Sequence, residues 1–261
     1  MYPNIKVHIT AQGVRYALFD QPEIISDELR RNNFWGVYRL ENADIVLRDS
    51  EPGTVIDVGA HLGTFCIPLS IKCPKFKYEA FEPVPTLNLQ LSTNVLLNKI
   101  DNIRTYRIGL DETNNTKEAP SLDVCFTNHG AYSFIEEFNR ARNIPPSTQT
   151  ESYEFRTLDS YKFQDVRLIK ISVSGMARQV LLGAVETLKQ QLPPLFIESW
   201  DDDYYAEEKS SISNLLREIG YKQTITNAGY LYAFNNQNLC NAVFEKMETQ
   251  KPGSLVTFRL R

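Results

Sequence analysis

Residues 54–65 read Thr-Val-Ile-Asp-Val-Gly-Ala-His-Leu-Gly-Thr-Phe, and this stretch decides the fold class of the chain. Its first five residues, Thr54 to Val58, are a short and mostly apolar run, which is typical of a strand buried on both faces. Gly59 and Gly63 follow, and a helix is expected to begin near Gly63. Glycines at a turn from strand to helix let the backbone approach a ligand closely. The stretch therefore predicts an α/β unit with a candidate ligand-binding loop.

The spacing of the two glycines leaves the kind of ligand open. The second glycine comes four residues after the first, which is not the G-x-G-x-x-G pattern of dinucleotide-binding proteins, and a purely structural turn is the alternative. The next expected strand, Lys77 to Phe81, is followed directly by Glu82, about 20 residues beyond the glycine loop. A carboxylate at that place can accept hydrogen bonds from both hydroxyls of a ribose; a solvated carboxylate is the alternative.

The alternation of strands and helices continues along the chain. We expect further strands at 103–108, 168–173 and 195–200, helices at 85–98, 176–191 and 207–219, and a hairpin from 221–226 and 230–234. These elements predict a doubly wound α/β fold with a mostly parallel sheet and a C-terminal antiparallel hairpin. In such a sheet, ligands bind at the carboxyl ends of the strands.

The same reading divides the chain into segments. Residues 1–50 are expected to form an N-terminal extension that packs on a main domain of residues 51–261. An insertion at about 111–160 interrupts the main domain. Within it, alternating side chains predict a half-exposed strand at 122–126, and the polar run 142–152 predicts a loop.

Several motifs in a fixed order make the chain resemble the FkbM-type methyltransferases. They are residues 57–65, 81–83, Asn94, Asn98, 157–160, 168–171, Gly175, 180–181, 183–184 and Glu198. The resemblance implies a seven-stranded, Rossmann-like class I methyltransferase sheet, S-adenosylmethionine as cofactor, and a hydroxyl, often of a sugar or natural product, as methyl acceptor. In that family the loop matching Asp57 to Gly63 holds the methionine part of the cofactor, and the residue matching Glu82 holds the ribose. The predicted cofactor-binding residues are Asp57, Gly59, Ala60, His61, Gly63, Thr64, Phe65, Glu82 and Gly109.

The chain departs from the family pattern after the fourth strand of the expected sheet. The family reads Lys-Ile-Asp-Val-Glu-Gly-Ala-Glu, whereas residues 170–177 read Lys-Ile-Ser-Val-Ser-Gly-Met-Ala. Acids are thus missing at Ser172, Ser174 and Ala177. Serine hydroxyls are not bases near neutral pH and are weak ligands for Mg²⁺ or Ca²⁺. We therefore predict no bound metal, and no group of His and Cys has the spacing of a zinc site.

Five residues are candidates for chemistry: Lys170, Glu198, Ser172, Ser174 and His129. Two interpretations of Glu198 stay open, namely a carboxylate that faces the cleft and an ion pair with Lys170. His129 is expected either to be solvated or to cover the site. The run Asp201-Asp202-Asp203 is best interpreted as an exposed acidic turn.

Three functions are compatible with these residues. The leading one is an S-adenosylmethionine-dependent O-methyltransferase that acts on a hydroxyl of a sugar, a glycan or another small acceptor. The second is a weak or inactive relative that binds the cofactor and serves as a binding module. The third is a nicotinamide-dependent oxidoreductase, which the glycine spacing disfavours.

Composition excludes other classes. Hydrophobic residues make up 42% of the 261 residues and the net charge is −4, which favours a folded core and argues against nucleic acid as a partner. No run is long enough to span a membrane, and we expect a cytoplasmic protein without a signal peptide. The four cysteines are interpreted as reduced thiols. Nothing in the sequence indicates an oligomeric state.

Overall fold

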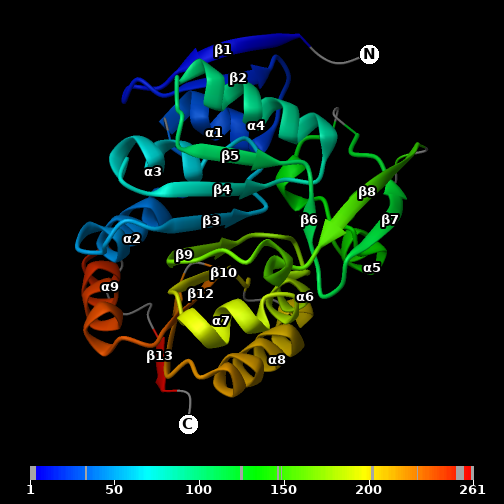
Figure 1. Cartoon of the computed structure of the whole chain (residues 1–261). Coiled ribbons are helices and arrows are strands. Elements are labelled where there is room, and N and C mark those ends of the chain that lie inside the picture. The colour runs from blue at the N-terminus through cyan, green and yellow to red at the C-terminus, as the bar shows by residue number, and fades with distance from the viewer. Residues whose placement is uncertain are drawn as a thin grey trace.

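The structure is a computed structural model in which a central sheet lies between two layers of helices (Figure 1). It describes residues 4–32, 34–123, 126–145, 147, 149–200, 203–227, 229–250 and 256–259. The strands of the central sheet are β3 (Thr54–Val58), β4 (Lys77–Phe81), β5 (Ile103–Tyr106), β9 (Val166–Ile171), β10 (Leu195–Glu198), β11 (Gln223–Asn227), β12 (Tyr230–Phe234) and β13 (Val256–Arg259).

The strand order is β13-β11-β12-β10-β9-β3-β4-β5. The five strands from β10 to β5 run parallel, and β12 returns antiparallel between β10 and β11. The seven strands expected in the central sheet, two of which form the C-terminal hairpin, are confirmed. The additional strand β13 pairs with β11 and makes the sheet eight-stranded. It thereby covers an edge of β11 that would otherwise expose unpaired backbone groups.

Strand β3 lies between β9 and β4, and all five of its side chains are buried. Its alternate residues belong to two different hydrophobic clusters. Val55 packs in the cluster of α2 (Val37–Arg48), α3 (Cys66–Lys72), α4 (Pro85–Leu97) and α9 (Gln237–Gln250), whereas Ile56 packs in that of α6 (Ala177–Leu182), α7 (Val185–Gln191) and α8 (Asp203–Ile219). Burial on both faces explains why Val55, Ile56 and Val58 are apolar, while the buried Asp57 of the same strand needs a counter-charge.

The single helix expected at 176–191 is wrong, because the chain forms α6 and α7 with a break at Gly183 and Ala184. The Gly183 carbonyl accepts a hydrogen bond from the Asp159 backbone N–H (3.0 Å). The Asp159 carboxylate in turn accepts the backbone N–H groups of Glu186 and Thr187 (2.9 and 2.8 Å), which caps α7. The motif at 157–160 thus starts a new helix.

Residues after β5 form a second, three-stranded sheet in the order β6-β8-β7, at the right of Figure 1. Its elements are β6 (Gly109–Leu110), β7 (Asn115–Pro120), the 3₁₀ turn η1 (His129–Ala131), α5 (Glu136–Ala141) and β8 (Thr150–Arg156), followed by the 3₁₀ turn η2 (Leu158–Tyr161). The strand expected at 122–126 is wrong at Leu122 and Asp123, which follow β7 without belonging to a strand; Val124 and Cys125 lie outside the described residues. The loop expected at 142–152 gives way to β8 at Thr150.

The N-terminal segment forms a hairpin of β1 (Ile5–Ile9) and β2 (Arg15–Phe19), followed by α1 (Ile24–Asn32). Side-chain amides of α4 pair with the backbone of β2: Asn94 Oδ1 accepts from the Ala17 N–H (2.7 Å) and Asn98 Oδ1 from the Arg15 N–H (2.8 Å). Asn94 Nδ2 also donates to the Leu62 carbonyl (2.9 Å). Both asparagines therefore hold this hairpin against the α4 layer, and Asn94 also holds the glycine loop.

Candidate functional site

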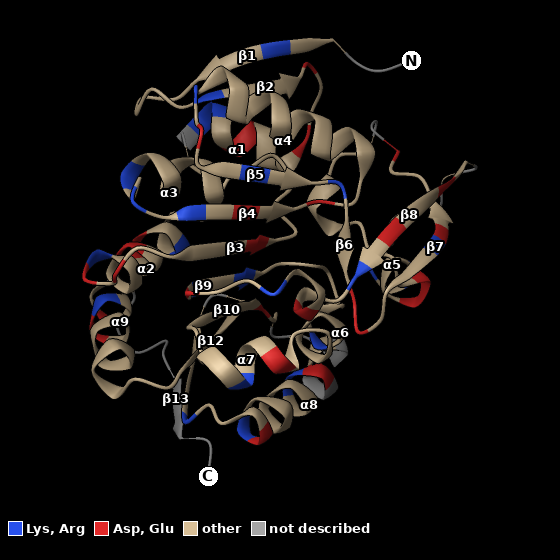
Figure 2. Ribbon diagram, in the orientation of Figure 1, with Lys and Arg blue, Asp and Glu red and all other residues tan. Residues whose placement is uncertain are grey.

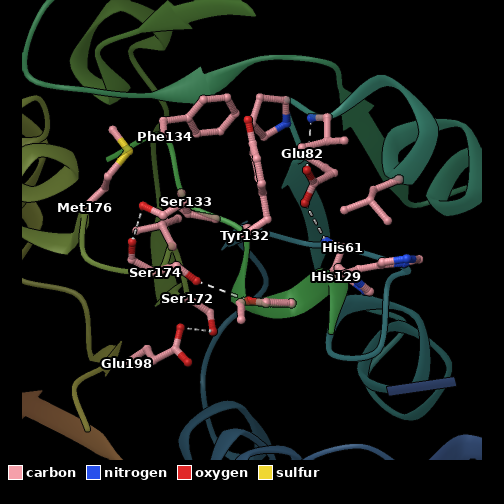
Figure 3. Close-up of a pocket in the computed structure, with 18 of the residues that line it drawn as sticks. His61, Glu82, His129, Tyr132, Ser133, Phe134, Ser172, Ser174, Met176 and Glu198 are labelled. Carbon is pink, nitrogen blue, oxygen red and sulfur yellow. Dashed lines mark hydrogen bonds between the residues drawn. The ribbon is translucent and has the colours of Figure 1, made fainter. Parts of the chain in front are cut away.

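A cavity of about 590 Å³ lies at the carboxyl ends of β3, β4, β9 and β10 (Figure 3). Such a volume is typical of a small-molecule site. From the adjacent strands β3 and β9, the next parallel strands along the chain are added in opposite directions: β4 and β5 on one side, and β10 on the other. The cavity therefore lies at the point where the strand order reverses.

Most of the predicted site residues line this cavity. They are Gly59, His61, Thr64, Phe65, Glu82, Gly109, His129, Lys170, Ser172, Ser174 and Glu198. Asp57, Ala60 and Gly63 do not line it. Of the acidic run after β10, Asp201 and Asp202 lie outside the described residues, as does the Asp203 side chain.

Asp57 and Lys170 form an ion pair underneath the glycine loop. Lys170 Nζ lies 2.9 Å from Asp57 Oδ1, and the two side chains are 7% and 0% exposed. The same ammonium group donates to the carbonyls of Gly59 (2.8 Å) and Val58 (3.3 Å). The ion pair considered between Lys170 and Glu198 is therefore wrong. Lys170 holds the strand end and the loop in place.

The loop itself is tightly packed. Gly59 has φ +72°, and a Cβ added there would lie 1.9 Å from the Ser172 carbonyl oxygen. Gly63 has φ +84°, and its added Cβ would lie 2.5 Å from Ile67 Cδ1. Both glycines are therefore needed to pack the loop against the protein, in addition to any close approach of a ligand.

Glu82 follows β4 and is 5% exposed. Its Oε2 accepts the His61 backbone N–H (2.9 Å) and its Oε1 accepts the Val84 N–H (3.0 Å), so β4 and the loop are joined through this side chain. Burial raises the pKa of Glu82 to about 7, although these N–H groups and Lys170 favour the charged form. The alternative of a solvated carboxylate is wrong.

The floor of the cavity carries a chain of oxygen atoms. Ser172 Oγ donates to Glu198 Oε2 (2.9 Å) and lies 2.8 Å from the Tyr230 hydroxyl. Glu198 Oε1 accepts from Trp200 Nε1 (2.8 Å). Glu198 thus faces the cavity, as one of its two interpretations required, with its carboxylate held on both oxygens.

The insertion closes over this floor. Ser174 Oγ donates to the Gly130 carbonyl (3.1 Å), and Ser133 Oγ donates to the Ser174 carbonyl (2.7 Å) (Figure 3). His129 is only 4% exposed and lines the cavity, so the expectation of a solvated histidine is wrong.

Several lining residues carried no signal in the sequence. They are Arg39, Tyr132, Phe134, Tyr205 and Tyr230. Arg39 lies over the Tyr230 ring, with its guanidinium carbon 4.8 Å from the ring centroid. Trp200 also lines the cavity, and its place directly after a strand end was a signal that the residues named above lack. The others come from α2, the insertion, α8 and the hairpin, which no motif links to the glycine loop.

Two further findings concern the described part of the chain. None of its helices is long and apolar enough to cross a membrane. Cys66, Cys73 and Cys240 are free and buried, while Cys125 lies outside the described residues.

Strand order, the glycine loop and the carboxylate after β4 define a Rossmann-like α/β protein of the methyltransferase class. A family model for the methyltransferase FkbM domain matches residues 57–232, more than half of the chain. The chain therefore belongs to the FkbM methyltransferase family, and its cofactor is S-adenosylmethionine. The oxidoreductase alternative is thereby excluded.

Relatives of known sequence or structure agree with this assignment. Methyltransferase sdnD of Sordaria araneosa is 22% identical over 244 residues, which cover 80% of this chain and 92% of that protein. The crystal structure of a methyltransferase FkbM from Methylobacillus flagellatus KT matches with a TM-score of 0.50 and 18% identity, over 72% of this chain and 45% of that one. This chain thus spans less than half of that protein, and at this identity the likeness shows the fold alone.

Proposed function

We propose that the protein transfers the methyl group of S-adenosylmethionine to a hydroxyl of a small acceptor such as a sugar. One observation supports this proposal most directly. The glycine loop and Glu82 line the same cavity as the hydrogen-bonded oxygen atoms of Ser172, Glu198 and Tyr230. The acceptor then lies between the cofactor loop and the floor of the cavity.

The residues present fit the cofactor. Glu82 is buried with each oxygen held by a backbone N–H, which leaves a lone pair on each oxygen for the ribose hydroxyls. The loop from Gly59 to Phe65 would hold the methionine part, with Asp57 and Lys170 as positioning residues beneath it. Gly109 lines the cavity after β5, where it would face the adenine ring of the cofactor.

A pH dependence of binding follows from Glu82. Its pKa of about 7 means that the carboxylate, which accepts both ribose hydroxyls, is lost as the pH falls through neutrality. If only the charged form binds, the dissociation constant of 5′-methylthioadenosine should rise about tenfold from pH 8 to pH 6, because the competent fraction falls by that factor. This probe carries the ribose but no titrating amino-acid part. Calorimetry at a series of pH values measures it.

The matched control is Glu82→Gln. It should weaken binding of the probe by about 1.5–3 kcal/mol at pH 8 and should show a flat pH profile. A wild-type profile as flat as that of the variant would remove the Glu82 carboxylate from the ribose site.

When bound, the cofactor supplies an electrophilic methyl group, which an acceptor oxygen takes as the carbon–sulfur bond breaks and the hydroxyl proton is released. An alcohol is a poor nucleophile, so a positioned base assists. Glu198 is that base in our proposal: Ser172 and Trp200 fix its carboxylate on the cavity floor, where it receives the proton. The aromatic side chains of Tyr132, Phe134 and Tyr205 line the same cavity.

Glu198→Gln should therefore lower kcat about a hundredfold or more, because general-base catalysis typically contributes that much, while cofactor affinity stays unchanged. The measurement is methyl transfer from labelled S-adenosylmethionine to a panel of sugars and other small alcohols. Glu186→Gln, at an exposed glutamate on α7, is the control. Full turnover in Glu198→Gln would assign the base elsewhere.

A binding module without catalysis is the second candidate. It is favoured by the hydrogen bonds of Ser172 and Ser174, because both hydroxyls are used within the protein where the family has acids. The test is the double variant Ser172→Asp/Ser174→Glu. Normal cofactor binding with no transfer to the panel, in the wild type and in the variant, would support the module.

The acceptor is proposed to be uncharged or weakly charged and not a nucleic acid, since the net charge of the chain is −4. The free buried cysteines favour a reducing compartment such as the cytoplasm.

A further inference from the structure

Three side chains from distant parts of the chain meet beside the cavity: Glu23, His61 and His129. Glu23 precedes α1, His61 lies in the loop after β3, and His129 begins η1. A side-chain oxygen or nitrogen of each lies within 4.8 Å of those of the other two. The side chains are 1%, 9% and 4% exposed, so the group is closed off from bulk solvent.

His61 has an unmet hydrogen-bonding capacity at this place. Neither its Nδ1 nor its Nε2 has a hydrogen-bond partner among the residues that the structure describes, although both atoms are buried. A buried polar group left unpaired is unfavourable, and binding of a ligand would remove that cost. A ring nitrogen that makes no hydrogen bond can offer its lone pair to a metal ion.

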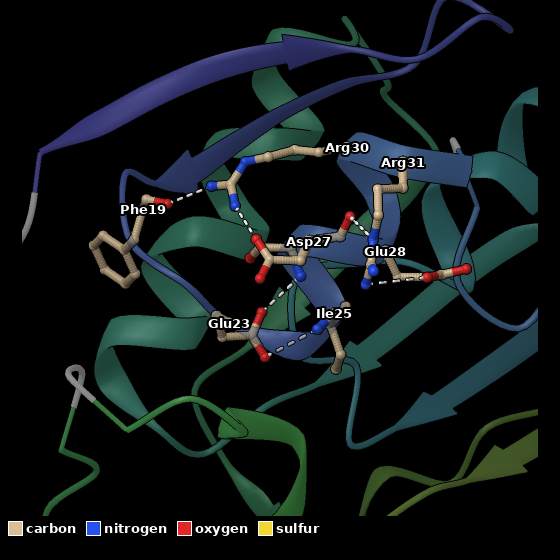
Figure 4. A network of polar contacts seen from close by, with 8 residues as sticks. Phe19, Glu23, Ile25, Asp27, Glu28, Arg30 and Arg31 are labelled. Carbon is tan, nitrogen blue, oxygen red and sulfur yellow. Dashed lines mark hydrogen bonds and ion pairs between the residues drawn. The ribbon is translucent and has the colours of Figure 1, made fainter.

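Glu23 supplies a carboxylate. Its Oε2 accepts the Ser26 N–H (2.7 Å) and its Oε1 the Ile25 N–H (3.2 Å), which caps α1 and fixes the side chain (Figure 4). Each oxygen keeps a second lone pair for a further partner.

Two imidazoles and one carboxylate are a typical ligand set for Zn²⁺ and similar transition-metal ions, whereas Mg²⁺ and Ca²⁺ prefer oxygen alone. Ligand atoms at about 2.0–2.2 Å from a tetrahedral ion are roughly 3.4 Å apart, so atoms within 4.8 Å need only small side-chain rotations. We propose that Glu23, His61 and His129 bind one divalent transition-metal ion of the Zn²⁺ type.

Such an ion would join three segments that are distant in the chain: the start of α1, the glycine loop and the insertion. His61 and His129 both line the cavity, so the proposed ion lies at its wall (Figure 3). The ion lies away from Ser172 and Glu198 on the cavity floor, where we predict no metal. The sequence could not reveal this group, because positions 23, 61 and 129 have no zinc-site spacing.

The test uses the full chain, stripped with a chelator and dialysed. We expect it to take up one equivalent of Zn²⁺, measured by elemental analysis, and to give Co²⁺ the visible absorption of a low-symmetry bound ion. Zn²⁺ should also raise the melting temperature, because it binds the folded state.

His61→Ala, His129→Ala and Glu23→Gln should each weaken Zn²⁺ binding at least tenfold. His8→Ala, which removes the third histidine of the chain on β1, is the matched control and should bind as the wild type does. No uptake by the wild type, no Co²⁺ spectrum, or equal affinity in His61→Ala and His8→Ala would overturn the proposal. The first two outcomes need no variant, so they decide it even if a variant fails to fold.

Discussion

Gly59→Val is expected to lose more than about 4 kcal/mol of unfolding free energy, an effect reserved for a few kinds of substitution. The backbone at Gly59 has φ +72°, which costs a β-branched residue about 1–3 kcal/mol by itself. The added Cβ would also lie 1.9 Å from the Ser172 carbonyl oxygen, and a backbone atom in a central strand end cannot move aside. Since domains are stable by about 5–15 kcal/mol, the variant should be at best marginally folded.

Gly13→Val separates the two causes. Gly13 has a similar φ of +81° but nothing within 4 Å of its added Cβ, so this variant carries the backbone strain without the overlap. Urea denaturation and S-adenosylmethionine binding measure both. Gly59→Val should lose cofactor binding and most of its free energy of unfolding. Gly13→Val should still bind S-adenosylmethionine. Equal losses in the two variants would mean that the contact with Ser172 is unimportant.

The sequence was most informative where one local cause decides the structure. The apolar run 54–58 has to be a strand buried on both faces, and the glycines after it have to form a turn. The carboxylate of Glu82 could be assigned to the same site, because neighbouring parallel strands end at the same edge of the sheet. These features depend on residues near one another in the chain.

The sequence was less informative where the partner of a residue lies on another element. Periodicity at 176–191 could not show that Asp159 caps a new helix after Gly183. Spacing could not show that Lys170 pairs with Asp57 and not with Glu198, since the two acids lie near the carboxyl ends of the two strands that flank β9. Glu23 was missed for the same reason: it approaches His61 and His129 only after the N-terminal segment has packed beside the loop.

Lys170→Met should cost about 3–5 kcal/mol, because it leaves the Asp57 carboxylate buried without a counter-charge. Asp57 is 0% exposed and Lys170 Nζ is 2.9 Å from it, so water cannot take the place of the ammonium group without disturbing the core. At roughly 2–4 °C per kcal/mol, the melting temperature should fall by about 10 °C. The lost bonds to the Gly59 and Val58 carbonyls also loosen the cofactor loop, so affinity for S-adenosylmethionine should fall as well.

Two further variants distinguish this pair from an ordinary ion pair. Arg140→Met breaks the pair of Arg140 with Glu136, whose side chains are 75% and 84% exposed, and should change stability by less than about 1 kcal/mol. Lys170→Met/Asp57→Asn removes both buried charges and should recover a large part of the loss, because a buried pair is costly mainly when half of it is removed. If the double variant is as unstable as the sum of the two single variants, the charges act independently. The loop would then be held by the lysine's bonds to the backbone carbonyls, and Asp57 would need another explanation for its place at the centre of the sheet.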